Sequence, residues 1–161
     1  MTIAPTLRRY LDRQHAVYEL VDHPPTLSAA ETARVAHVPA SCIAKAVLLE
    51  LPQQAHDHLL AVLAANRRID LDDLRIELDQ KPRLASEGEV EQVFNDCAPG
   101  AVPVGFGYRV PMIVDDVLVR EPDLFFEGGD HRTLIHMEQA EFRRLLAQAR
   151  HGSFGMLALD A

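Results

Sequence analysis

A lysine on the apolar face of a predicted strand is the first residue of this sequence whose type and position could do chemistry. Residues 43–51 read Ile-Ala-Lys-Ala-Val-Leu-Leu-Glu-Leu, and strand alternation places Lys45 in a row of four aliphatic side chains. A lysine in such a row must extend past the apolar surface, pair with an anion, or lose part of its basicity. Two interpretations stay open, a residue whose charge simply reaches solvent and a functional ammonium.

A loop rich in glycine and proline is the second chemical feature. Residues 98–107 contain three glycines and two prolines. This composition excludes a helix or a central strand, because proline lacks an N–H donor and glycine has little area to pack. Backbone N–H groups on such a loop can hold a carboxylate, a phosphate or a developing oxyanion. The alternative is an ordinary connection into the strand expected at 110–114.

Histidine and cysteine side chains supply further candidates. His131 ends a glycine turn, Glu-Gly-Gly-Asp-His at 127–131, where it could orient a substrate, accept a proton, or lie in solvent. Cys97 precedes the loop without an implied basic partner, which favours a packed thiol over a nucleophile. His56 and His58 have the spacing of two metal ligands on one strand face, but no third ligand is near in sequence, and we interpret them as hairpin surface residues.

The totals limit the class of protein. With 161 residues, 48% of them hydrophobic, the chain suits one domain, and a formal charge of −8 argues against a broad basic face for nucleic acid. We find no apolar run long enough for a membrane span and no cleavable leader, and therefore expect a cytoplasmic protein. The motifs of serine hydrolases, phosphate-binding loops, zinc proteases and dinucleotide-binding folds are missing, so neither a metal, a cofactor nor a covalent intermediate is expected.

Periodicity and capping signals predict the elements that must position these residues. The expected helices lie near residues 7–12, 28–38, 70–78, 86–94 and 138–149, and the expected strands at 17–21, 43–51, 59–64, 83–85, 110–114, 117–119, 124–126 and 132–137. Short strands joined by hairpins and interrupted by helices predict a single α+β domain over residues 1–161, with a core at about 10–147. Its sheet should be mixed and largely antiparallel.

Six segments, in their order along the chain, resemble the YbaK-like family, the free-standing relatives of the editing domain inserted in bacterial prolyl-tRNA synthetase. Each segment alone is weakly specific, but their common order makes the resemblance specific. The segments are residues 18–26 (Tyr-Glu-Leu-Val-Asp-His-Pro-Pro-Thr), 40–51 with its central lysine, 84–89, 99–103, 114–116 and 126–131.

The resemblance implies a fold, an activity and a site. Family members hydrolyse the ester that joins a wrong amino acid to the 3′ adenosine of a tRNA, on a mixed, partly rolled sheet flanked by helices. The implied partners are the acceptor end of a mischarged tRNA and, as a candidate, an aminoacyl-tRNA synthetase. The implied residues are Lys45, Gly100 and His131 as catalytic groups, and Ala46, Ala101, Val102, Pro103, Gly128, Gly129 and Asp130 as substrate-binding groups.

Two departures from the family pattern keep other functions open. Ala46 stands where a threonine, serine or asparagine is common, and Val104 where proline is common. Both changes could alter which amino acid fits. The alternatives to a deacylase are a non-catalytic module that binds a nucleotide or a partner protein, and a metal-dependent hydrolase using His56, His58 and His131. The sequence does not specify the amino acid, the tRNA or the oligomeric state.

Overall fold

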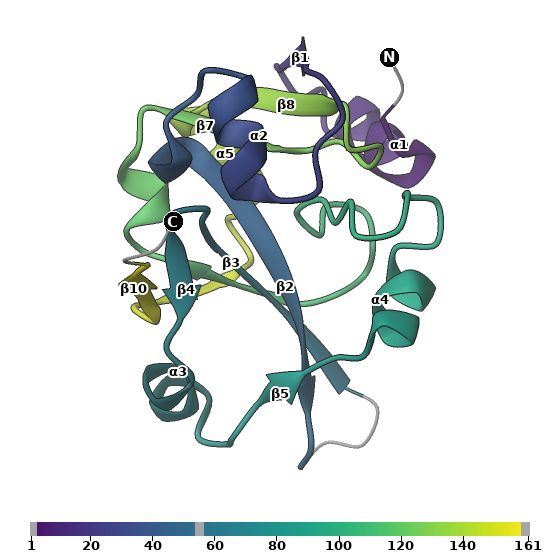
Figure 1. Ribbon diagram of the computed structural model, residues 1–161. Coiled ribbons are helices and arrows are strands. Elements are labelled where there is room, and N and C mark those ends of the chain that lie inside the picture. The colour runs from purple at the N-terminus through teal and green to yellow at the C-terminus, as the bar shows by residue number, and fades with distance from the viewer. Residues whose placement is uncertain (1–2, 54–56, 159–161) are drawn as a thin grey trace.

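A mixed β-sheet forms the centre of the protein in a computed structural model that describes residues 3–53 and 57–158 (Figure 1). The strand order is β1-β8-β7-β2-β3-β6-β9, and β5 pairs with β2 beside this path. The bounds are β1 Glu19–Asp22, β2 Ile43–Leu51, β3 Asp57–Ala64, β5 Arg83–Leu84, β6 Met112–Asp115, β7 Asp123–Glu127, β8 Thr133–Glu138 and β9 Arg150–Gly152; a separate pair consists of β4 Arg67–Ile69 and β10 Gly155–Leu157.

The direction of the strands makes the sheet mixed. The pairs β2·β7, β3·β6 and β6·β9 are parallel, and the other pairs of this sheet are antiparallel. Figure 1 shows β2 and β3 crossing the molecule, with β7 and β8 near one end of β2 and β5 near the other. The predicted α+β class with a mixed sheet is confirmed.

One edge of β2 is paired at both ends and open between them. Pairing with β7 involves Ile43 and Ala44, and pairing with β5 involves Leu49 and Glu50. The opposite edge is paired with β3 along nearly its whole length. The sheet is therefore interrupted beside the middle of β2, where Lys45 lies.

Three of the helices, α2, α3 and α4, begin where capping residues predicted them. The five helices of the described ranges are α1 Pro5–Arg13, α2 Ala29–Val35, α3 Leu71–Leu78, α4 Glu87–Val93 and α5 Gln139–Leu145. Ser28 and Asp70 accept N–H bonds in the first turns of α2 and α3, and Ser86 forms a reciprocal capping box with Glu89 at α4. None of the helices in these ranges is long and apolar enough to cross a membrane.

Both faces of β2 are packed, as the alternation predicted. Ala44 and Leu48 face the larger core, which contains Phe106, Phe126 and Phe142. On the other face Leu49 and Leu51 belong to a second core with Leu63, Leu74 and Phe154, whereas Ile43 belongs to a small cluster that includes Ala33 of α2. Lys45 shares this second face and lies between its two clusters, where the apolar cover is interrupted.

Several predicted elements differ from the observed ones. Residues 118–120 form a 3₁₀ turn instead of part of a strand, with Leu118 fully buried, and this turn lies on the connection between β6 and β7, which are not neighbours in the sheet. Helix α5 ends at Leu145, and the chain then forms β9, which the sequence analysis did not predict; β4 was not predicted either, and β10 lies in the C-terminal tail, for which a strand was one of two alternatives. The tip of the predicted hairpin after β2, with His56, lies outside the described residues.

Candidate active site

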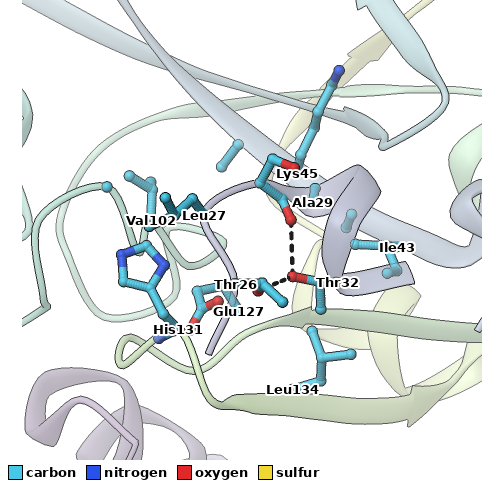
Figure 2. Close-up of a pocket in the computed structure, with 14 residues that line it drawn as sticks. Thr26, Leu27, Ala29, Thr32, Ile43, Lys45, Val102, Glu127, His131 and Leu134 are labelled. Carbon is cyan, nitrogen blue, oxygen red and sulfur yellow. Dashed lines mark hydrogen bonds between the residues drawn. The ribbon is translucent and has the colours of Figure 1, made fainter. Parts of the chain in front are cut away.

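A cavity of about 200 Å³ opens where β2, α2 and two loops meet (Figure 2). It brings together segments that are far apart in sequence, because β2 supplies one wall, the residues from 26 to 32 another, and the loops around 100 and 131 the rest. The residues that line it are Thr26, Leu27, Ser28, Ala29, Thr32, Ile43, Ala44, Lys45, Ala46, Gly100, Val102, Glu127, His131 and Leu134.

The cavity contains half of the residues that the sequence singled out. Lys45, Ala46, Gly100, Val102 and His131 line it. The other five predicted residues support its loops from behind. They are Ala101, which is buried; Pro103, also buried; Gly128 and Gly129, which pack close to Ile3 and Ala4; and Asp130, whose carboxylate accepts hydrogen bonds from the Arg132 N–H and the Thr133 hydroxyl.

Lys45 carries a charge that no described acidic side chain balances at ion-pair distance. Its side chain is half-buried, and this burial lowers the pKa of the ammonium because the charged form loses hydration. Figure 2 shows the side chain extending from β2 away from Glu127 and His131. The ammonium is therefore available to an anionic or carbonyl oxygen of a ligand at that side of the cavity.

The loop after Pro99 is fixed by the turn at 127–131. His131 donates from Nε2 to the Pro99 carbonyl over 2.6 Å, and the Ala98 N–H donates to the Gly129 carbonyl over 2.8 Å. Since a carbonyl can only accept, Nε2 carries the proton of a neutral His131 ring and Nδ1 is its free nitrogen. This contact gives His131 a positioning role that its place at a turn did not reveal.

Gly100 and Val102 are the residues of this loop that line the cavity and have a peptide N–H without a backbone acceptor in the described chain. The Ala101 N–H bonds to the Ala98 carbonyl, whereas those of Gly100 and Val102 have no backbone acceptor in the described chain. Gly100 has a φ of +78°, which glycine adopts without strain, and a Cβ there would still lie 3.7 Å from the His131 ring. Backbone conformation, more than crowding, thus favours glycine at this position.

Glu127 is a charged cavity residue that the sequence analysis did not select. Its Oε1 atom accepts hydrogen bonds from the N–H groups of Gly129, Asp130 and His131 at 2.9, 3.1 and 3.0 Å. Figure 2 shows its carboxylate between Thr26 and His131. An acidic residue immediately before two glycines was the available signal, because such a side chain can accept the N–H groups of the turn that follows.

Two threonines form a polar part of the cavity wall that sequence analysis also missed. The Thr32 hydroxyl donates to the Ser28 carbonyl over 2.9 Å, so the hydrogen bond between the two threonine hydroxyls is donated by Thr26. Both side chains are buried. Their apolar neighbours in the wall are Leu27, Ala29, Ile43 and Leu134.

The two departures from the family pattern lie in different surroundings. Ala46 lines the cavity and also packs against the larger core. Val104 is fully buried in the larger core and does not line the cavity. Because Val104 packs in the core, an effect of this position on which amino acid fits would have to act through the packing of the loop.

The remaining candidate nucleophile and ligands lie outside the cavity. Burial raises the pKa of Cys97 to about 11, and its Sγ lies 3.4 Å from the Tyr108 hydroxyl behind the glycine turn. His58 hydrogen-bonds to Glu89 and lines a different depression from His131, so these two histidines do not form one site. Over residues 3–53 and 57–158, no cluster of three or more His, Cys, Asp or Glu side chains could hold a metal ion.

Comparison with protein families shows which family the part of the chain around the cavity matches. A family model described as the aminoacyl-tRNA editing domain matches residues 23–145, a span that contains every residue lining the cavity. The chain belongs to the aminoacyl-tRNA editing domain family. The resemblance to YbaK-like proteins is thereby confirmed.

Solved structures share the fold of this editing domain. A hypothetical protein superposes with a TM-score of 0.81 at 19% identity, covering 94% of this chain and 99% of its own. A proposed trans-editing enzyme for prolyl-tRNA synthetase has a TM-score of 0.78 at 23% identity, with 96% and 99% covered. A proposed signal-transduction protein from Marinobacter aquaeolei VT8 gives 0.74 at 19% identity, with 94% and 30% covered. Comparison with curated proteins finds no match.

Proposed function

We propose that this editing domain is an aminoacyl-tRNA deacylase that acts in trans on a small amino acid attached to the wrong tRNA. The observation that carries the proposal is that Lys45 lines one cavity with Gly100 and Val102, whose peptide N–H groups are free of backbone acceptors. A cavity of about 200 Å³ is small, which suits a small aminoacyl group.

The proposed reaction needs little more than binding and electrostatic stabilisation. An aminoacyl ester is already activated, so a water oxygen adds to its carbonyl carbon and the carbonyl oxygen becomes an oxyanion. The N–H groups of Gly100 and Val102 would stabilise this oxyanion. The carbon–oxygen bond to the ribose then breaks, and the ribose oxygen takes a proton, which releases the free amino acid and the tRNA.

Lys45 and His131 have separate roles in this proposal. The Lys45 ammonium binds a phosphate or carbonyl oxygen of the terminal nucleotide and need not lose its proton to do so. His131 positions the loop after Pro99 by donating to the Pro99 carbonyl, and its Nδ1 is the ring atom that could accept a proton. The neighbouring ribose hydroxyl of the tRNA assists the attacking water.

The acidic chain predicts how the tRNA is bound. A formal charge of −8 does not support many phosphate contacts along an RNA helix. Recognition should therefore concentrate on the acceptor end, with an aminoacyl-tRNA synthetase as a candidate partner. Tight and strongly salt-dependent binding to arbitrary RNA would contradict this expectation.

A deacylation assay tests the function directly. We expect the protein to release at least one amino acid from tRNAs charged with alanine, serine, threonine, cysteine or proline, at a rate well above spontaneous hydrolysis. Activity that survives a chelator would reject the metal-dependent reading. A failure to hydrolyse any of the five esters would reject the deacylase.

The second candidate is a non-catalytic module that binds a nucleotide or a partner protein with the same cavity. The observation in its favour is that Ala46, which has no polar side chain, lines the cavity at a position where the family often has one. Binding of a terminal-adenosine analogue without turnover of any charged tRNA would support this candidate over the deacylase.

A further inference from the structure

Glu127 has one carboxylate oxygen engaged by the protein and one that remains for a ligand. Oε1 accepts all three N–H groups of the turn, whereas Oε2 has no hydrogen-bond partner among the described residues. Oε2 is not among the fully buried polar atoms without a partner in this part of the chain, so it keeps some accessible surface, and Glu127 is one of the residues that line the cavity. A second polar group can therefore reach it.

The cavity thus contains two charges of opposite sign that do not neutralise each other. Within the described chain neither Lys45 nor Glu127 takes part in an ion pair within 4 Å. Figure 2 shows the Lys45 ammonium extending away from Glu127. Such a cavity complements a ligand that carries a cation at one end and an anionic or strongly accepting oxygen at the other.

An aminoacyl ester on a nucleotide has this distribution of charge. Its α-ammonium, protonated for the most part at neutral pH, lies about 2.5 Å from the ester carbonyl carbon, since two bonds of about 1.5 Å join them. The nucleotide phosphate lies beyond the ribose, on the other side of the ester. A carbonyl held by the N–H groups of Gly100 and Val102 would place the α-ammonium near the loops and the phosphate farther out.

The structure keeps Glu127 in a fixed relation to those N–H groups. The turn that Glu127 organises ends in His131, which donates to Pro99 immediately before Gly100. The Gly129 carbonyl of the same turn accepts a hydrogen bond from the Ala98 N–H. The carboxylate and the two free peptide donors therefore belong to one hydrogen-bonded unit, so a ligand can bind both without reorganising either loop.

We infer that Glu127 accepts a hydrogen bond from the substrate's α-ammonium through Oε2, so that the site selects aminoacyl esters with a free α-amine over N-acylated ones. This inference rests on the proposed deacylase function and adds a residue that determines specificity. Acylation removes the positive charge, adds bulk, and leaves the carboxylate without its cation. Formylated and peptidyl esters should consequently be poor substrates.

A binding experiment separates this role from a structural one. The probe is adenosine monophosphate with a 3′-alanylamido group, which resists hydrolysis and can carry a free or an acetylated α-amine. We expect calorimetry to show that the wild-type protein binds the free amine at least about tenfold more tightly than the acetylated form. Glu127→Gln retains a side-chain oxygen for the three turn N–H groups but loses the charge, and should bind both probes about equally.

The control variant is Glu91→Gln, which makes the same change at an exposed position of α4. It should keep the wild-type ratio of affinities. A wild-type protein that binds both probes equally, or neither, overturns the inference. A Glu127→Gln variant that keeps the wild-type ratio overturns it as well, because the turn alone would then explain the carboxylate.

Turnover distinguishes this inference from the function on which it rests. Equal hydrolysis of alanyl-tRNA and N-acetyl-alanyl-tRNA, with alanyl-tRNA a substrate, would leave the deacylase intact and overturn the role of Glu127. Absence of all hydrolysis together with preferred binding of the free-amine probe would reject the deacylase and retain recognition of the ammonium.

Discussion

Replacement of Lys45 by methionine should nearly abolish editing without weakening the fold. Methionine keeps most of the aliphatic stem beside β2 and removes the charge. Among the described residues that line the cavity there is no arginine, so none of them supplies a second fixed cation to replace the ammonium. Loss of one preorganised charged contact in a partly desolvated site costs roughly 10²- to 10³-fold in turnover. We expect a decrease of this size in kcat/KM for a charged tRNA.

The same substitution should raise the free energy of unfolding. Burial lowers the pKa of Lys45 below its ordinary value of 10.5, which means that the folded protein disfavours the charged form. Between the lowered pKa and 10.5, the unfolded chain holds a proton that the folded chain has lost. Wild-type stability should therefore rise with pH in this window. Binding of an uncleavable nucleotide probe should fall there, because the ammonium is the binding form.

The sequence provides a close control for this prediction. The chain has two lysines, and the other, Lys81, lies outside the cavity. Lys81→Met should retain wild-type turnover, as measured by amino acid release, and urea denaturation should show no comparable gain in stability. Turnover of Lys45→Met within about twofold of wild type would refute the proposed role, and a lower midpoint in urea would refute the argument from burial.

Three further substitutions test the packing of the fold and a thiol outside the cavity. Gly107→Ala should destabilise the protein by roughly 2 kcal/mol or more in urea denaturation, because φ is +87° and the new Cβ would lie 2.9 Å from the Cβ of Tyr10. Gly88→Ala in α4 is the control and should not destabilise the protein, because the new Cβ would lie 3.9 Å from its nearest neighbour, the Ser86 hydroxyl oxygen. Asp115→Ala leaves the N–H groups of residues 154 and 155 without their acceptor and should lower the free energy of unfolding by roughly 2 to 4 kcal/mol. A decrease of less than about 0.5 kcal/mol would contradict this account. Cys97→Ser should keep the wild-type turnover. Alkylation of Cys97 in the wild-type protein should be slow at neutral pH and should accelerate toward the thiol pKa of about 11. A large loss of activity in a folded serine variant would restore the nucleophile hypothesis.

The parts of the fold that local chemistry determines could be predicted from the sequence. Alternation along residues 43–51 correctly assigned the two faces of β2, because both faces are packed and a one-residue shift would exchange them. Ser28, Asp70 and Ser86 marked the first turns of three helices, since a side-chain acceptor before a helix satisfies N–H groups that have no other partner. The strands β4, β9 and β10 have only three residues each, too few to show a period.

The parts of the site that depend on tertiary contacts could not be predicted in the same way. Thr26 and Thr32 are ordinary residues in sequence, and only the packing of α2 against β2 brings their hydroxyl groups into the cavity wall. The hydrogen bond of His131 to Pro99 joins two loops whose approach no local pattern encodes. Lys45 was identifiable because a charge in an apolar row is a local anomaly, whereas Glu127 occupies a turn where acidic residues are common.

The gap in strand pairing along β2 bears on how much position 46 can vary. On the side of β2 that contains the gap, the Leu48 carbonyl accepts a hydrogen bond from the Ala85 N–H. Because every second residue of a strand directs its N–H and C=O groups to the same side, the N–H and C=O groups of Ala46 also face the gap. Ligand or water must satisfy this donor and acceptor. Substitutions at position 46 can therefore reshape the wall while the main chain continues to offer the same two contacts, which separates the choice of amino acid from the means of holding it.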